Sequence, residues 1–251
     1  MNVASLTSKS AITQIKSREK TIGAITPFSS LDYPGYLSAV IFFQGCPWRC
    51  RYCYNTELWD TQKAKYSWLE AKRFLEERCG LLEAVVFSGG EPTTQFNLEF
   101  MMEEVKQMGF KVALHTAGMY PQKLASVLKY CDWVAMDIKA PFYEYEKITR
   151  VRRSGVAVRQ SVHEILASGC DYEFRTTWHT SLLSVQDIKD ISDDLRIIGV
   201  KNYVLQAFSE KPGVRLMKQR SDWSHYCLPH LIDYLQSSFE KFSVREERLV
   251  A

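Results

Sequence analysis

Six short apolar runs alternate with longer amphipathic segments along most of the chain, and this alternation constrains the fold more than any other feature. The runs predict strands at residues 37–43, 84–88, 111–116, 133–138, 172–178 and 202–208. Helices of about 10 to 15 residues between short buried strands favour a parallel sheet with right-handed crossovers. The sequence therefore predicts an α/β protein built from repeated βα units.

The predicted helices carry recognisable capping signals. Ser67 and Glu70 have the spacing of a capping box, and Gly80 follows the helix that they begin. Further helices are predicted at residues 97–108, 121–130, 158–168, 184–198 and 229–242. Several of them begin at a serine or proline or stop at a glycine, which supports their boundaries.

Polar residues of catalytic types lie at or near the end of each predicted strand. In chain order they are the cysteines of residues 46–53, the segment 88–92, His115 and Thr116, Asp137 and Lys139, Arg175 to His179, and Gln206. A doubly wound sheet is the competing architecture. In a parallel barrel, however, the chemistry gathers at the C-terminal ends of successive strands. The pattern therefore favours a barrel type of sheet.

Cys46, Cys50 and Cys53 stand at C-x3-C-x2-C spacing on one loop. Three thiolates can hold three irons of a [4Fe-4S] cluster, which leaves the fourth iron open to a cofactor such as S-adenosylmethionine (SAM). A closed zinc site would need a fourth Cys or His nearby, and the next candidates, Cys79 and His115, are in no paired spacing. The motif therefore favours an iron–sulfur cluster over zinc.

Bulk properties limit the function classes. With 251 residues and 46% hydrophobic residues, the chain suits one α/β barrel domain, expected over residues 21–251 after a polar arm at residues 1–20. A net charge of +3 is too small to argue for nucleic acid or a membrane surface. No apolar stretch approaches the ~20 residues of a membrane span, and the N-terminus lacks the apolar region of a secretory signal. We therefore expect a cytoplasmic protein.

The segment of residues 29–60, SSLDYPGYLSAVIFFQGCPWRCRYCYNTELWD, resembles the activating enzymes of glycyl radical enzymes within the radical SAM superfamily. It is similar above all to the long form that activates anaerobic ribonucleoside-triphosphate reductase, with the activating enzymes of pyruvate formate-lyase as near relatives. These relatives often carry His-Asn after the third cysteine, where this chain has Tyr54 and Asn55.

This resemblance implies a fold, two cofactors and a reaction. The fold would be a partial, open parallel (β/α)6 barrel. One [4Fe-4S] cluster would be bound by Cys46, Cys50 and Cys53, and its electron would cleave SAM to a 5'-deoxyadenosyl radical. That radical would abstract hydrogen from a glycine of the partner, a glycyl radical enzyme that is expected to be an anaerobic ribonucleotide reductase. Reduced flavodoxin or ferredoxin would supply the electron.

The same resemblance implies roles for cofactor-binding residues. Gly89, Gly90 and Glu91 match the segment that holds the methionyl amino group of SAM, and the glycines would also allow close backbone approach. Tyr52 would lie against the adenine. Thr116 is also expected at the cofactor site, although a short strand ending in a polar residue fits a structural role equally well.

Three further strand-end residues complete the implied site. Asp137 and Lys139 match an Asp-x-Lys pattern found near the methionyl carboxylate and the substrate peptide. Arg175 is expected to bind the methionyl carboxylate; because a buried charge needs a partner, an internal salt bridge is the alternative. His179 could contact the ribose or the partner loop, or it could serve the fold. A monovalent cation site is not expected, because His115 stands where a relative has an aspartate.

Two other functions remain open. One is a radical SAM enzyme acting on a small molecule, such as a 7-carboxy-7-deazaguanine synthase, against which stands the lead-in Leu31 to Gly35. The other is a non-enzymatic iron–sulfur or zinc protein, whose EPR spectrum would not respond to SAM.

Overall fold

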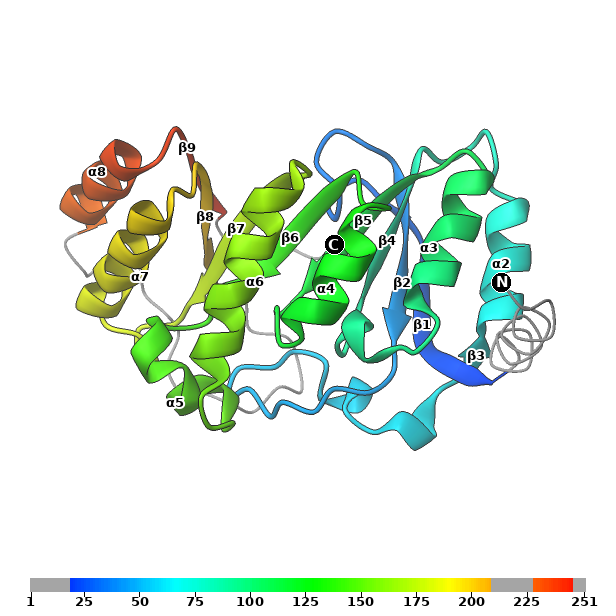
Figure 1. Ribbon diagram of the computed structural model, residues 1–251, viewed down its shortest axis with the longest axis horizontal. Coiled ribbons are helices and arrows are strands. Elements are labelled where there is room, and N and C mark those ends of the chain that lie inside the picture. Colours follow the sequence, from blue (N-terminus) through cyan, green and yellow to red (C-terminus); the bar gives the residue numbers. More distant parts are fainter. Residues whose placement is uncertain (1–18, 209–227, 246–251) are drawn as a thin grey trace, which may run out of the picture. The chain divides into compact units, whose positions relative to one another are not determined.

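The computed structural model describes residues 19–208 and 228–245 (Figure 1). These residues form two compact units. Unit 1 comprises residues 19–47, 55–116 and 122–134, and unit 2 comprises residues 48–54, 117–121, 135–208 and 228–245. The expectation of one domain over residues 21–251 stays a prediction, and all but the last two residues of the expected arm at 1–20 lie outside the described residues.

The strands of unit 1 follow the order β3-β1-β2-β4-β5. They are β1 (Lys20–Ser29), β2 (Ser38–Phe43), β3 (Tyr66–Ser67), β4 (Ala84–Gly89) and β5 (Lys111–Thr116). β4 pairs with β2 and with β5 in parallel, as expected, so these three strands end at one edge. That edge gathers the segment after β2, the Gly-Gly-Glu segment and Thr116.

The first strand is absent from the sequence-based expectation. β1 runs antiparallel to β2, with register irregularities between Ile22 and Ala24 and between Thr26 and Ser29. These irregularities contain Gly23 and Pro27, two residue types that weaken a strand pattern. β1 therefore carries bulge-like breaks that conceal its strand character in the sequence.

The helices of unit 1 match the capping signals. They are α2 (Trp68–Glu76), α3 (Leu98–Gln107) and nearly all of α4 (Pro121–Leu128). Ser67 and Glu70 form the expected capping box of α2. Figure 1 shows α2 and α3 side by side, and the Trp68 indole Nε1 donates to the Glu104 carboxylate of α3 at 2.6 Å.

The strands of unit 2 follow the order β6-β7-β8-β9. They are the unit 2 part of β6 (Trp133–Asp137), β7 (Asp171–Trp178), β8 (Asn202–Ala207) and β9 (Lys241–Arg245). β8 is parallel to β7 and to β9, so the C-terminal ends of these strands also share an edge. The helices are α5 (Tyr145–Thr149), α6 (Ser154–Ser168), α7 (Val185–Ile198) and α8 (Leu228–Ser238).

Two helix boundaries in unit 2 correct the expectation. The helix predicted at residues 229–242 is wrong at its end, because α8 stops at Ser238 and residues 241–245 form β9. In β9 the alternating Phe242 and Val244 pair with β8 as a parallel strand. The helix expected from Val158 begins earlier, at Ser154, where Gly155 packs against the Phe142 backbone.

Both units bury continuous apolar strands. In unit 1, Ile41, Val86 and Leu114 are fully buried, and in unit 2 so are Phe174 and Leu205. Strands buried on both faces are typical of parallel sheets covered by helices. No helix within residues 19–208 and 228–245 is long and apolar enough to cross a membrane.

Candidate active site

The Gly-Gly-Glu segment of unit 1 lies against the backbone that leads into the cysteine loop. The Gly90 N–H donates to the Phe43 carbonyl at 2.9 Å, and the Glu91 N–H donates to the Gly45 carbonyl at 3.0 Å. Cys46 follows Gly45, and its N–H donates to the Trp59 carbonyl at 3.4 Å. The ends of β2 and β4 thus place Glu91 beside the residue that precedes the first cysteine.

Both glycines of this segment are required by close backbone contacts. Gly89 has φ +122°, and a Cβ there would lie 2.2 Å from the Phe43 nitrogen. A Cβ on Gly90 would lie 2.4 Å from the Gly45 carbonyl oxygen. The close approach expected from the sequence is therefore present at both positions.

Replacing Gly90 with alanine should destabilise the protein and weaken its binding of SAM. The added methyl group would force the Gly45 backbone away and disturb the hydrogen bond that places Glu91. Overpacking of this kind costs about 1–3 kcal/mol. Urea unfolding measures the stability, and equilibrium binding measures the SAM affinity.

Gly169→Ala is the matched control. Gly169 also tolerates a side chain poorly, because its φ is +72°, but a Cβ there meets open space. This variant should lose stability through backbone strain of about 1–2 kcal/mol and keep its SAM affinity. Equal SAM affinity in the two variants would contradict the role given to the Gly90 contact.

Glu91 is a fully buried carboxylate at the end of this segment. Its Oε1 accepts hydrogen bonds from the Thr93 N–H at 3.1 Å, the Thr93 hydroxyl at 2.6 Å and the Thr116 hydroxyl at 2.7 Å. These three donors are neutral groups that orient the carboxylate. The geometry suits a cationic amine. Thr93 is a site residue that sequence reasoning did not identify.

The segment Leu31 to Gly35 is fixed to the end of β5 within unit 1. The Asp32 carbonyl accepts from the His115 ring at 2.8 Å. Tyr33 stacks on Trp133 with ring centroids 5.2 Å apart and planes 13° apart. His115 therefore contacts the lead-in segment that, by resemblance, is typical of activating enzymes.

Cys50 and Cys53 lie in unit 2 on a turn held by backbone hydrogen bonds. The Cys53 N–H donates to the Cys50 carbonyl at 3.2 Å, and the Arg51 N–H donates to the Ile148 carbonyl of α5 at 3.1 Å. Burial raises the pKa of the Cys50 thiol, and the positive charge of Lys139 opposes this only in part.

Asp137, Lys139 and Arg175 come together in unit 2. The Asp137 carboxylate accepts from Lys139 Nζ at 3.0 Å through Oδ2 and from Arg175 Nε at 3.2 Å through Oδ1. Lys139 Nζ also lies 5.5 Å from the centre of the buried Tyr52 ring. The Tyr145 hydroxyl accepts from the Lys139 N–H at 2.8 Å and donates to the Asp137 carbonyl at 3.1 Å. Tyr145 is a second residue that sequence reasoning did not identify.

The charge state of Lys139 follows from these contacts. Burial alone would lower its pKa, but the attraction of Asp137, with smaller contributions from Tyr52 and Cys50, raises the pKa well above its usual range. Lys139 is therefore protonated near neutral pH. The internal salt bridge considered for Arg175 is present, and its role toward the cofactor stays a prediction.

His179 and Gln206 make contacts within unit 2 that also serve the fold. The His179 ring, 2% exposed, accepts from the Ser181 N–H through Nδ1 at 3.1 Å. Gln206 donates to the Thr177 hydroxyl at 2.6 Å. A cofactor contact of His179 stays a prediction.

Tyr54, the residue after the third cysteine, stacks on Phe208 at the end of β8. The ring centroids are 4.9 Å apart and the planes differ by 16°. The edge of His179 meets the same Phe208 ring at 5.2 Å. The residue that departs from the relatives' His-Asn pair is thus part of an aromatic cluster that adjoins Cys53.

Replacing Tyr54 with alanine should loosen the turn that carries Cys53. Aromatic pairs are worth about 0.5–1.5 kcal/mol beyond their burial, so we expect a lower melting temperature and less iron per chain after reconstitution. Tyr54→Phe keeps the stacked ring and should match the unsubstituted protein. If the alanine and phenylalanine variants bind iron equally well, the stack does not support the turn.

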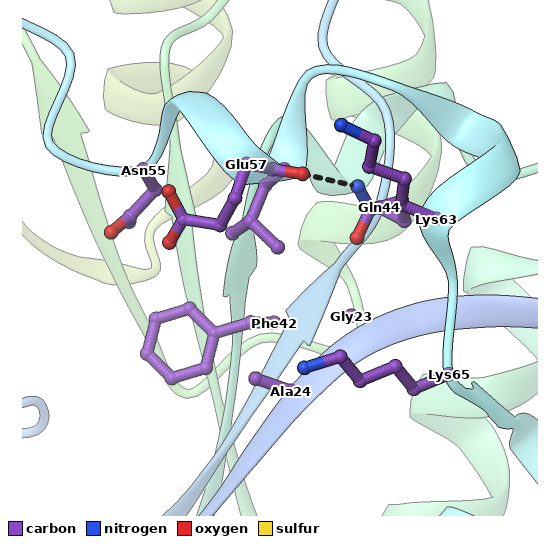
Figure 2. Close-up of a pocket in the computed structure, with 9 residues that line it drawn as sticks. Gly23, Ala24, Phe42, Gln44, Asn55, Glu57, Lys63 and Lys65 are labelled. Carbon is purple, nitrogen blue, oxygen red and sulfur yellow. Dashed lines mark hydrogen bonds between the residues drawn. The ribbon is translucent and has the colours of Figure 1, made fainter.

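A pocket of about 310 Å³ lies in unit 1 (Figure 2). Figure 2 shows the Gln44 amide donating to the Glu57 carbonyl, a bond of 2.7 Å. The pocket is lined by Gly23, Ala24, Phe42, Gln44, Asn55, Glu57, Leu58, Lys63 and Lys65.

The donor set of the cysteine loop fits an iron–sulfur cluster by its chemistry. Cys46, Cys50 and Cys53 form no disulfide, and thiolates are the ligands that such clusters take. In the described part of the chain, no group of three or more His, Cys, Asp or Glu side chains is arranged to hold a metal ion. The assignment of the cluster to these thiols therefore stays a prediction from their spacing.

The family model for the radical SAM superfamily matches residues 40–196. The chain belongs to the radical SAM superfamily. Enzymes of this superfamily bind a [4Fe-4S] cluster through three cysteines and use SAM, so the expected cofactors are confirmed at the level of the superfamily. The match includes the cysteine motif, the Gly-Gly-Glu segment, Asp137 and Arg175.

Curated relatives within the radical SAM superfamily lie among the activating enzymes. A protein of Methanocaldococcus jannaschii, provisionally named glycyl-radical enzyme activating enzyme MJ1227, is 29% identical over 197 residues, which cover 76% of this chain and 80% of the relative. The pyruvate formate-lyase-activating enzyme of Clostridium pasteurianum is 35% identical over 128 residues, 47% of this chain and 52% of the relative. The chain thus matches about half the length of the second relative.

A solved radical SAM structure shows the fold. SuiB of Streptococcus suis bound to SAM matches with a TM-score of 0.63 and 15% identity, over 81% of this chain and 48% of SuiB. The likeness confirms the expected fold class, α/β with mainly parallel strands of the radical SAM type.

Proposed function

We propose that this radical SAM enzyme is an activating enzyme that abstracts a hydrogen atom from a glycine of a partner glycyl radical enzyme. The observation that carries the proposal is the similarity to the Methanocaldococcus jannaschii relative across three quarters of the chain. The ordered contacts of Asp32 and Tyr33 add support, because by resemblance their segment is typical of activating enzymes.

The chain's own side chains would bind the two cofactors. Cys46, Cys50 and Cys53 would supply three thiolates to the cluster. Glu91, buried and held by neutral donors, would accept the methionyl amine of SAM, and Arg175 would pair with the methionyl carboxylate. In these roles the negative Glu91 would meet the positive amine of the methionyl group, and the positive Arg175 would meet its negative carboxylate.

When bound, the cluster and SAM would supply a 5'-deoxyadenosyl radical, and the protein's part would be to hold the reactants and exclude water. Tyr52 and Tyr145 are almost fully buried, and Lys139 is 7% exposed. These buried residues would exclude water from one side of the turn that carries Cys50 and Cys53.

The proposed partner is an anaerobic ribonucleotide reductase, with reduced flavodoxin or ferredoxin as electron donor, in the cytoplasm. This choice rests on the resemblance of residues 29–60 to that group of activating enzymes. The partner glycine would need to enter the SAM site as part of an extended segment.

The test is anaerobic reconstitution with iron and sulfide, reduction, and incubation with SAM and the candidate reductase. We expect a glycyl radical doublet in the EPR spectrum of the reductase and one 5'-deoxyadenosine per radical. 5'-Deoxyadenosine without a protein radical would contradict the partner and favour a small-molecule substrate. A cluster spectrum that does not respond to SAM would contradict radical SAM chemistry altogether.

A further inference from the structure

Five charged side chains of unit 2 alternate in sign along one chain of contacts. Lys139 Nζ lies 3.0 Å from Asp137 Oδ2, and Arg175 Nη2 lies 3.2 Å from Asp137 Oδ1. Arg175 Nη1 lies 4.0 Å from Glu173 Oε1, and Arg245 meets both Glu173 oxygens at 2.7 Å. The chain of contacts joins β6, β7 and β9.

Glu173 pairs more closely with Arg245 than with Arg175. Its side chain is 5% exposed, so its charge needs a partner inside the protein. Arg245 supplies two parallel N–H bonds, the strong bidentate geometry, whereas Arg175 stays at 4.0 Å. Because the Glu173 carboxylate is paired with Arg245, it does not draw Arg175 away from its hydrogen bond to Asp137.

The five charges sum to a single positive charge, from three cations and two carboxylates. The carboxylate of SAM carries one negative charge. Without Arg245 the remaining four groups would be neutral, and Glu173 would attract Arg175. Both effects would weaken the binding of an anion at Arg175.

We infer that Arg245, on the last strand β9, is a positioning residue of the SAM site. It holds Glu173, and by doing so it leaves Arg175 and one net positive charge for the methionyl carboxylate. The inference rests on the proposed assignment of Arg175 to that carboxylate. It makes β9 part of the cofactor site. Sequence reasoning missed both new residues, although a second charge two positions before Arg175 in an apolar run is a signal for Glu173.

The test compares the affinity of SAM with that of decarboxylated SAM, which lacks the carboxylate, in the reconstituted protein under anaerobic conditions. Arg245→Met should weaken SAM binding about tenfold, the loss expected for one hydrogen-bonded charge, and leave the decarboxylated analogue unchanged. The double variant Glu173→Gln with Arg245→Met restores one net positive charge. It should bind SAM within about threefold of the unsubstituted protein, because replacing a buried ion pair by neutral residues is often tolerated.

A merely structural role gives different results. It predicts that Arg245→Met weakens both ligands equally and that the double variant does not recover, and either result overturns the inference. Thermal unfolding of each variant without SAM checks the fold. If Arg245→Met does not fold, the single variant Glu173→Gln decides. It leaves two net positive charges near Arg175, so it should bind SAM at least as tightly as the unsubstituted protein. Weaker binding overturns the inference.

Arg175→Met separates this inference from the proposed function. It should weaken SAM binding and spare the decarboxylated analogue. If it does so while Arg245→Met changes nothing, the role of Arg245 is wrong and the assignment of Arg175 stands. If Arg175→Met leaves SAM binding intact, the carboxylate assignment fails, and the inference fails with it.

Discussion

Replacing Cys50 with alanine should abolish the cluster and all chemistry that depends on it. Two thiolates cannot hold the three irons that the motif supplies with ligands. Cys50 is also the most buried of the three motif cysteines, so water cannot easily replace its sulfur. We expect almost no iron or acid-labile sulfide after reconstitution, no cluster EPR signal, and neither 5'-deoxyadenosine nor a glycyl radical.

Cys79→Ala is the matched control, because Cys79 is an exposed thiol outside the motif. It should retain the iron content and the EPR signal of the unsubstituted protein. Circular dichroism of the two apoproteins should agree, since alanine removes a single sulfur atom. Full iron incorporation in Cys50→Ala would exclude the three-cysteine cluster, and zinc rather than iron in the unsubstituted protein would favour the structural metal site.

The sequence predicted the parts of the fold that follow from local rules. The runs that became β2, β4 and β5 are continuous and apolar, and the capping box of Ser67 and Glu70 forms as expected. Strand β1 escaped prediction because Gly23 and Pro27 interrupt its pattern at the register irregularities. Local patterns therefore predict continuous apolar strands well, and bulged strands such as β1 or half-exposed strands such as β9 poorly.

Individual site residues were predictable where a motif fixes the backbone. Gly89 and Gly90 are such a case, because only glycine fits their contacts. Arg245 was not predictable, because its contact to Glu173 joins segments that are brought together only by packing. Tyr145 is close to Lys139 in the sequence, but no motif marks it. No spacing rule in a single sequence reports the distance between strands β7 and β9.

Replacing Asp137 with asparagine should strongly destabilise unit 2 and prevent SAM binding. The change leaves Lys139 and Arg175 without their shared carboxylate, and their side chains are only 9% and 11% exposed. Breaking a buried ion pair by removing one partner costs about 3–5 kcal/mol. Urea unfolding of the apoprotein under reducing conditions measures the change in the free energy of unfolding.

The pH dependence of this loss of stability tests whether the buried charge of Lys139 causes it. In the unsubstituted protein the pKa of Lys139 is raised, so its contribution to stability is fully present below the unfolded lysine pKa of about 10.4 and is lost only as the pH rises through the folded value. In Asp137→Asn burial dominates and lowers the pKa of Lys139. The folded state of the variant then favours neutral lysine, so its free energy of unfolding should rise between about pH 7 and 10. The difference in the free energy of unfolding between the variant and the unsubstituted protein should therefore narrow over this range.

The exposed pair of Lys201 and Glu240 provides the control for this experiment. Both side chains are 65% exposed, so Glu240→Gln removes one carboxylate from a solvated pair. That variant should show little change in stability at pH 7, because water screens the remaining lysine. A loss in Asp137→Asn as small as that of Glu240→Gln, or a gap that stays constant up to pH 10, would show that Asp137 does not stabilise a buried, protonated Lys139. The role inferred for Arg245 would then be weakened, because the sum of five charges on which it rests counts Asp137 as the carboxylate that pairs with Lys139 and Arg175.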